Sequence, residues 1–268
     1  MPPMVGGIFY EHGHRMAASA VGFLTLVLAV WTGRTEQRRG VRWLAWTALA
    51  VVVAQGVLGG LTVLLLLPTS ISVAHACLAQ TFFCLVIALA YSTSAEWQAG
   101  GDGRPEDAQG LRPAAALATG VVFLQLVVGA LMRHMGAGLA IPDFPLAFGR
   151  LLPPSWSAAV TVHFAHRLGA LLATVAIAVL LVRARRAGDT RLSRPALLAA
   201  ALVAVQLALG ATTVLSGKAV LPTTAHVATG AAILGTCWML TLRAWRLTRP
   251  GPGPASLPLA VRDRTASA

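Results

Sequence analysis

Long apolar runs alternate with short polar connections along most of the chain. Seven runs are long enough to cross a bilayer as helices, and we expect them at 14–33, 43–67, 71–94, 113–132, 157–182, 196–215 and 223–242. They are too long and too uniformly apolar to be strands of a membrane barrel. Because lipid cannot satisfy backbone polar groups, the pattern predicts an all-α integral membrane protein.

The composition agrees with that prediction. Of 268 residues, 56% are hydrophobic and only 11% are charged, and the mean hydropathy is +0.72. Soluble domains carry about 25% charged residues, so the composition excludes an ordinary soluble protein. The three cysteines, Cys77, Cys84 and Cys237, all lie inside apolar runs. They therefore predict neither a disulfide framework nor a cysteine metal motif. The first residues lack the basic and apolar pattern of a cleavable signal peptide.

Positive charge lies between the apolar runs rather than in a separate domain. The net charge is +12, and arginines cluster at 34–42, 183–194 and 243–249. Such clusters flank spans on the cytoplasmic side, where anionic lipid headgroups attract them. We therefore expect a multi-pass protein of the inner (plasma) membrane, with its N-terminus outside and its C-terminus in the cytoplasm. No basic soluble region is present to bind nucleic acid, so the sequence excludes that class of partner.

An internal repeat divides the chain into two halves. Seven residues recur 151 positions later, and three near the N-terminus are echoed 152 positions later. The first set is Gln55, Gly59, Gly60, Thr62, Val63, Leu64 and His75, matched by Gln206, Gly210, Ala211, Thr213, Val214, Leu215 and His226; the second is Glu11, His14 and Arg15, matched by His163, His166 and Arg167. Fixed offsets of this kind indicate a duplicated unit. We expect an N-terminal half at 1–95, a cytoplasmic linker at 96–112, a C-terminal half at 113–247 and a disordered tail at 248–268.

The two halves are unequal in length. The second half has an additional span at 113–132, whose counterpart would precede Met1. The chain therefore has a 3+4 arrangement of helices where the repeat predicts 4+4. Two explanations are open, a first helix that has been lost or a chain that starts late.

Four histidines occupy repeat-related positions near the same end of their spans. His14 and His75 lie in the first half, and their repeat counterparts His166 and His226 lie in the second. Two imidazoles at matched depth on neighbouring helices can bind one haem iron. A single intramembrane histidine more often serves packing, but four at repeated positions favour two bis-histidine haem sites, one in each helical-bundle half.

Three charged residues accompany these histidines. Arg15 and Arg167 each follow a candidate ligand directly, so each could pair with a haem propionate or anchor its helix at the membrane surface. Glu11 lies three residues before His14, on the same helix face, and its repeat counterpart is a histidine. A carboxylate at one site alone predicts proton transfer there, and the alternative is a solvated acid at a helix N-terminus.

These motifs resemble the haem A synthase family of CtaA/Cox15 type. The resemblance rests on EHGHR at 11–15, HFAHR at 163–167, the Gln-x-x-x-Gly segments at 55–62 and 206–213, and the loop that follows Gly129. It implies a membrane oxidoreductase that converts the C8 methyl group of haem O into a formyl group, giving haem A for cytochrome oxidase. It also implies that His14, His75 and Arg15 bind the substrate haem, with Glu11 as the catalytic carboxylate. His166 and His226 would be the axial ligands of a haem B cofactor.

Partners follow from the same resemblance. An electron donor, ferredoxin-like or quinone-linked, and a haem O synthase that supplies the substrate are expected, with both haem sites toward the outer side of the membrane. Two alternatives fit the histidines without that chemistry. One is a di-haem membrane cytochrome b that transfers electrons without modifying haem, and the other is a haem-free transporter or assembly factor built on a repeat.

Overall fold

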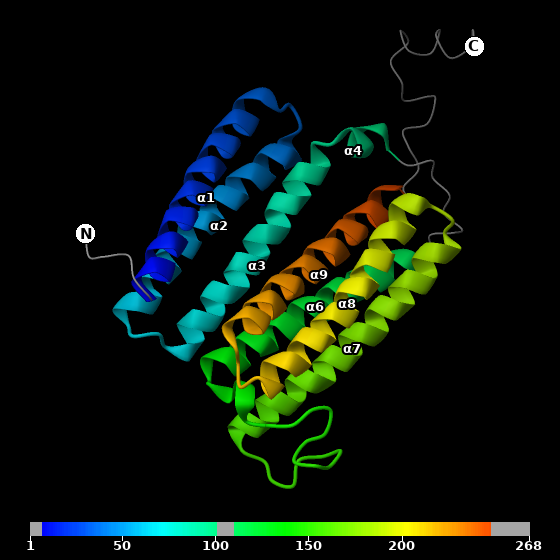
Figure 1. Ribbon diagram of the computed structural model, residues 1–268. Coiled ribbons are helices and arrows are strands. Elements are labelled where there is room, and N and C mark those ends of the chain that lie inside the picture. The colour runs from blue at the N-terminus through cyan, green and yellow to red at the C-terminus, as the bar shows by residue number, and fades with distance from the viewer. Residues whose placement is uncertain (1–6, 101–109, 248–268) are drawn as a thin grey trace, which may run out of the picture.

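Seven long helices dominate the computed structural model, which describes residues 7–100 and 110–247 (Figure 1). The helices are α1 (Gly7–Thr35), α2 (Arg39–Leu64), α3 (Thr69–Ser92), α4 (Ala95–Ala99), α6 (Leu111–His134), α7 (Ala158–Arg186), α8 (Thr190–Leu215) and α9 (Val220–Leu247), with a short 3₁₀ helix at Ala137–Leu139. All except α4 and the 3₁₀ helix are long and apolar enough to span a membrane. The prediction of an all-α membrane protein with seven spans is confirmed.

Most helices extend past the apolar runs that predicted them. α7 continues to Arg186, four residues beyond its predicted end, and α9 begins three residues early and ends five residues late. Arginine is a good helix former, so the backbone hydrogen bonds continue into the polar region at the membrane surface. Hydropathy therefore located the spans but underestimated their lengths.

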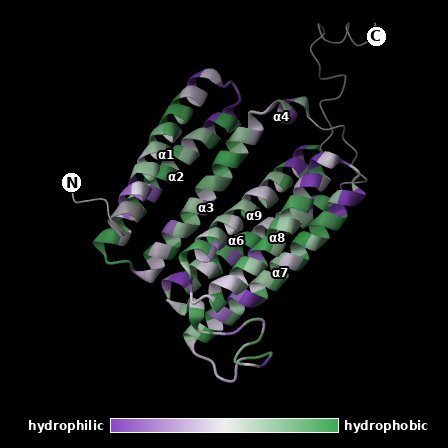
Figure 2. Cartoon of the chain, viewed as in Figure 1, coloured by the Kyte–Doolittle hydropathy of each residue, from purple (hydrophilic) through white to green (hydrophobic). Residues whose placement is uncertain are grey.

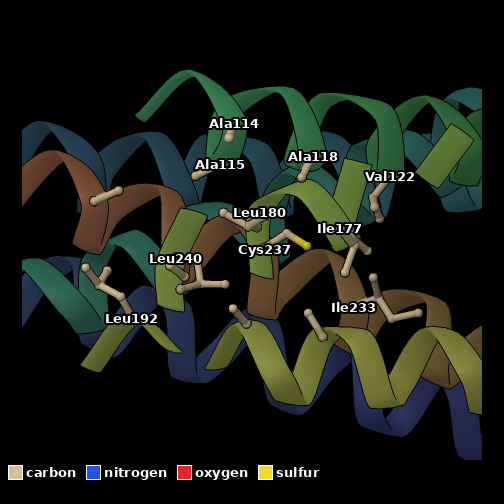
Figure 3. Close-up of a cluster of buried hydrophobic side chains, with 14 of the residues drawn as sticks. Ala114, Ala115, Ala118, Val122, Ile177, Leu180, Leu192, Ile233, Cys237 and Leu240 are labelled. Atoms are coloured by element: carbon tan, nitrogen blue, oxygen red, sulfur yellow. The ribbon is translucent and has the colours of Figure 1, made fainter. Parts of the chain in front are cut away.

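The second half is a closed bundle of four helices. α6 packs on α7 and α9, and α8 packs on the same two helices. Its core consists mainly of alanine, leucine, valine and isoleucine side chains, several of which are completely buried (Figure 3). Small side chains such as Ala115, Ala118, Ala196 and Ala199 let the helix backbones approach closely, and this contact drives association in lipid.

The first half is more open. α1 packs mainly on α2, α2 packs on α3, and α3 also contacts α6 and α9 of the second half (Figure 1). Its buried apolar cluster contains only Ala29, Val41, Ala45 and Leu89. This half therefore supplies much less internal packing than the four-helix half.

Two turns at repeat-related positions have the same backbone conformation. Leu67 and Lys218, 151 residues apart, adopt positive φ angles of 62° and 67°. The backbone N–H of Leu67 donates to Thr62 O at 2.7 Å, and that of Lys218 donates to Thr213 O at 2.8 Å. The same hydrogen bond therefore ends α2 and α8 and directs the chain into α3 and α9.

Polar contacts join the halves at their arginine-rich end. Arg243 of α9 donates two hydrogen bonds, of 2.9 and 2.8 Å, to the carboxylate of Glu96 in α4, which also accepts one from Tyr91. Arg246 donates to the carbonyl of Trp97 at 2.7 Å. The first residues of the segment expected to be a linker thus form a short helix attached to α9, while 101–109 and the expected tail at 248–268 lie outside the described residues.

Arginines gather at the end of the bundle where α1, α3, α7 and α9 finish (Figure 2). The described clusters lie at the turn from α1 to α2, at the turn from α7 to α8, and in the last turns of α9. The opposite end carries the turns from α2 to α3 and from α8 to α9 and the long loop between α6 and α7. The two ends of the molecule therefore differ strongly in charge.

Replacing Glu96 tests the junction between the halves. Glu96→Ala leaves Arg243 and Tyr91, both at least partly buried, without their acceptor, and such a loss costs about 1–3 kcal/mol. We expect a lower midpoint of thermal unfolding for the purified protein in detergent. Glu36→Gln is the control, because Glu36 pairs only with Arg38 two residues away. Equal midpoints for Glu96→Ala and the wild-type protein would contradict the proposed role of this junction.

Candidate functional site

The four candidate histidines lie at one end of the bundle, opposite the arginines. His14, His75, His166 and His226 come six to eight residues after the first residues of α1, α3, α7 and α9. These four helices run in the same direction, so the histidines share a depth of about 9–12 Å from the helix starts. The repeat therefore places all four side chains in one layer of the molecule.

His166 and His226 face each other within the four-helix half. Their ring centroids are 6.3 Å apart, and the planes of the rings meet at 66°. A bond from a transition metal to an imidazole nitrogen is about 2 Å long. Two such bonds, together with the distance from each nitrogen to the centroid of its ring, add up to about the observed separation. The pair therefore has the spacing needed to hold one metal ion between the rings.

The contacts of His226 suit a metal ligand. Its Nδ1 lies 3.2 Å from the backbone carbonyl of Gln206, which can accept a proton from that nitrogen. Metal-binding histidines usually donate their second ring N–H to such an acceptor, which leaves Nε2 free for the metal. The side-chain amide of Gln206 lies 3.5 Å from Nε2. The orientation of this ring is thus determined by one residue of α8.

His166 is held by a glutamine of α6. The Gln125 amide donates to the backbone carbonyl of His166 at 2.8 Å and lies 3.1 Å from Nδ1 of the ring. Gly169, one turn further along α7, leaves room for this side chain, because an added Cβ would overlap Gln125 Oε1. The sequence analysis did not single out Gln125. The available signal was its Gln-x-x-x-Gly spacing, which also occurs in α2 and α8.

His75 has a similar neighbour in the first half. The Gln55 amide nitrogen of α2 lies 3.3 Å from His75 Nε2, while His75 Nδ1 is buried without a hydrogen-bond partner. His14 of α1 is close enough to interact electrostatically with His75. The structure therefore brings the predicted pair into one region, although His14 itself is exposed and no described side chain hydrogen-bonds to it.

Glu11 and Arg15 pair with each other. The distance between Arg15 Nη2 and Glu11 Oε1 is 2.6 Å, and both side chains are more than half exposed. The two residues lie one turn apart on the exposed part of α1, on either side of His14 along the chain. A carboxylate, a guanidinium and an imidazole are therefore accessible together at the open side of the first half.

The loop between α6 and α7 is fastened to α7 by the residues that repeat Glu11 and Arg15. His163 is 2% exposed, and its Nδ1 accepts the backbone N–H of Ile141 at 3.3 Å. Arg167 donates to the carbonyl oxygens of Leu146, Ile141 and Asp143. The role predicted for Arg167, pairing with a propionate, would require this guanidinium to share or exchange those carbonyl partners. No role for His163 could be predicted from the sequence, because its partner is a loop backbone 22 residues away.

Asp143 organises the same loop. Its carboxylate accepts the backbone N–H groups of Gly149 at 2.7 Å and Phe148 at 2.8 Å. These bonds, with Gly149 contributing most and Arg167 adding a favourable charge, hold the pKa of the Asp143 carboxyl below its usual range. The ionised form of Asp143 therefore stabilises the loop beside the histidine layer.

Comparisons with known proteins agree with this arrangement. The model of a family described as cytochrome oxidase assembly protein (COX15-CtaA) matches residues 6–238. The chain is 35% identical over 217 residues to the heme A synthase of Symbiobacterium thermophilum, an alignment that covers 79% of this chain and 71% of the relative. It is 30% identical over 263 residues to the heme A synthase of Caulobacter vibrioides, covering 90% and 74% of the two chains. A third heme A synthase, from a Methylobacterium species, is 34% identical over 255 residues, covering 84% and 67%.

Acid should loosen the loop through Asp143. Because the pKa of Asp143 is lowered in the folded protein, its contribution is complete at neutral pH and is lost as the pH falls below about 4, the ordinary range of aspartate. We expect the amides of Phe148 and Gly149 to exchange hydrogen faster there, after correction for the intrinsic pH dependence of exchange. Asp143→Asn should remove this pH dependence. Equal protection of the two amides across this range in the wild-type protein would contradict the assignment.

Proposed function

The chain belongs to the COX15-CtaA family of cytochrome oxidase assembly proteins, and we propose that it oxidises the C8 methyl group of haem O to a formyl group, giving haem A. It is a membrane enzyme of haem A biosynthesis for cytochrome oxidase, as its family and its relatives named heme A synthase indicate. The observation that carries the specific reaction is the layer of repeated histidines, with a carboxylate at one of its two sites only. The methyl carbon exchanges two hydrogen atoms for one oxygen atom, a four-electron oxidation for which dioxygen would be the oxidant. In each of two hydroxylations one oxygen atom would enter a C–H bond, the electron donor would supply two electrons to reduce the other oxygen atom to water, and the resulting hydrated aldehyde would lose water.

His166 and His226 fit the axial ligands of a haem B cofactor. Their rings are separated by the distance that two metal bonds require, and a backbone carbonyl leaves Nε2 of His226 available. Bound there, haem B would supply electron transfer by changing the oxidation state of its iron. Both rings are half-buried between packed helices, whereas His14 is exposed, and this difference suits a resident cofactor rather than an exchanging substrate at His166 and His226.

The open first half fits the substrate. His14 and His75 would bind the iron of haem O, and the exposed side of α1 gives a large planar molecule a way in and out. Glu11 would take up protons and pass them on as the methyl group is oxidised. Arg15, now paired with Glu11, could bind a propionate and keep the carboxylate close to the ring edge.

The charge difference between the two ends supports an orientation. Arginines mark the end expected in the cytoplasm, so the histidine layer would lie toward the outer side of the inner (plasma) membrane. We propose a ferredoxin-like or quinone-linked electron donor and a haem O synthase as partners, because the reaction needs both electron exchange and a supply of haem O.

Direct product analysis tests the proposed reaction. The chain is co-expressed with a haem O source, and the haems are extracted in acid, separated by chromatography and identified by mass. We expect haem A or its hydroxymethyl intermediate from the wild-type protein. Glu11→Gln should retain bound haem but lose most of the product, because the general base is removed, and such groups contribute about 10²–10⁴-fold to rate. Glu36→Gln is the control, since Glu36 lies at the other end of α1.

Unconverted haem O bound to the wild-type protein would contradict the oxidation and favour a di-haem cytochrome. A colourless protein without any haem would favour the transporter or assembly-factor alternative. Full product formation by Glu11→Gln would refute the assignment of Glu11 while leaving the reaction itself established.

Removing either proposed haem B ligand should lower the content of that haem. His166→Ala and His226→Ala each delete one imidazole of the facing pair, so each variant should be purified with much less haem B than the wild-type protein. The measurement is the ratio of extracted haem B to protein. His12→Ala serves as the control, because His12 lies outside the repeated set. Wild-type haem B content in both histidine variants would exclude this pair as the ligands.

A further inference from the structure

Three of the spanning helices carry the same short motif at the same depth. Gln-x-x-x-Gly occurs in α2 at 55–59, in α6 at 125–129 and in α8 at 206–210. In each helix the glutamine lies nine residues before the last helical residue. Each motif faces the histidine of the next spanning helix, namely His75, His166 and His226. The motif therefore recurs on α6, which has no repeat counterpart in the first half, as well as on the repeat-related pair α2 and α8.

The glycine of each motif lies directly against the edge of an imidazole ring. A Cβ added at Gly59, Gly129 or Gly210 would come within 3.0–3.1 Å of the Cε1 atom of the facing histidine. Contacts of that length are tighter than a normal carbon–carbon contact of about 3.5–4.0 Å, so a methyl group would force the ring to move. Each ring can therefore occupy its observed position because the facing residue is a glycine, which has a hydrogen atom in place of a Cβ.

Neighbouring glycines do not share this property. Gly60 follows Gly59 directly, yet a Cβ at Gly60 would meet nothing within 4 Å. Its repeat counterpart is Ala211, whereas the counterpart of Gly59 is again a glycine. Gly120, on the exposed face of α6, also has open space around it. Within these motifs and at the compared neighbours, the close contact thus occurs at the glycines that face histidine rings and not at Gly60 or Gly120.

The glutamine of each motif directs its amide to the same histidine. The amide nitrogens of Gln55, Gln125 and Gln206 lie 3.3, 3.1 and 3.5 Å from an imidazole nitrogen of the facing ring. All three Oε1 atoms are buried without a hydrogen-bond partner. Because burying an unpaired carbonyl oxygen is costly, these side chains are poor choices for packing alone. Their described polar contacts all go to the histidine-bearing helix.

We propose that the three Gln-x-x-x-Gly motifs are histidine cradles, in which the glycine admits the ring edge and the glutamine fixes the rotation of the ring before iron binds. Gln55, Gln125 and Gln206 are positioning residues, and this role rests on the proposed binding of haem iron by the facing histidines. Orienting a ligand in advance lowers the entropy lost on binding. The amide contacts to Nε2 of His75 and His226 give way where that nitrogen binds iron. His14, exposed and without such a cradle in the described part of the chain, belongs to the site where haem must exchange.

The test compares cradle variants with matched neighbours in haem-depleted protein titrated with haem B in detergent. Gln206→Met removes the amide but keeps a side chain of similar length, and Gly129→Ala pushes on the ring of His166. Each should weaken haem B binding by up to about 10-fold, the cost of immobilising one further freely rotating side chain on binding. Alanine is a better helix former than glycine, so Gly129→Ala should not lower the thermal unfolding midpoint through the helix itself.

Gln80→Met and Gly120→Ala are the controls. Gln80 is another buried glutamine with an unpaired Oε1, but its amide has no described hydrogen bond to a histidine. Both controls should bind haem B like the wild-type protein. A second readout, ¹⁵N NMR of the histidine ring nitrogens in the haem-free protein, should show altered His226 shifts in Gln206→Met and unchanged shifts in Gln80→Met.

The outcomes separate this proposal from the proposed function. Wild-type haem B affinity and wild-type ring shifts in Gln206→Met and Gly129→Ala would overturn the cradles. If the wild-type protein binds no haem B, the proposed function fails, and the ring shifts still decide whether the glutamines position the histidines. Altered shifts with weakened haem B binding in the cradle variants alone would support both.

Discussion

An imidazole ring inside a bilayer carries two nitrogen atoms that lipid cannot satisfy, and the helix arrangement gives at least one of them a protein partner in His75, His166 and His226. Around His166 and His226 the partners are the glutamines of α6 and α8, and around His75 the partner is the glutamine of α2. Each glutamine must lie at the depth of its histidine on an adjacent antiparallel helix. The end of each glutamine-bearing helix and the short turn that follows it, such as the turns at Leu67 and Lys218, must therefore place the glutamine and the histidine at the same depth.

The two halves share a repeated design but differ in the surroundings of their histidines, and we propose different roles for them. In the second half, the facing rings are half-buried between the four helices, the alanine-rich core lies toward the arginine-rich end, and His163 and Arg167 fasten a long loop beside the rings. In the first half, the residues at the equivalent positions, Glu11 and Arg15, are exposed and pair with each other. A closed site that retains a cofactor and an open site that exchanges a substrate are the natural roles of these two environments.

Much of the fold could be predicted from hydropathy and the repeat. The seven spans and the division into related halves follow from patterns along the chain, whereas the helix ends do not, because helices such as α7 continue through arginines at the membrane surface. The repeat identified the histidines and Glu11 as candidates, and their haem-binding roles stay predictions. It could not reveal the binding of the loop by His163, since that contact depends on how the loop folds back. Gln125 was not predicted as a site residue, because no repeat counterpart of its helix is found in the first half of the given sequence. Its spacing to Gly129 nevertheless matches the other two motifs.

Electron paramagnetic resonance of the oxidised, purified wild-type protein tests the central claim most directly. The account holds that the closed half binds one haem iron between two imidazoles, at the pair of rings 6.3 Å apart. It predicts the low-spin ferric signal of a haem with two histidine ligands. A purely high-spin signal, or none from a protein that retains its fold, would contradict it.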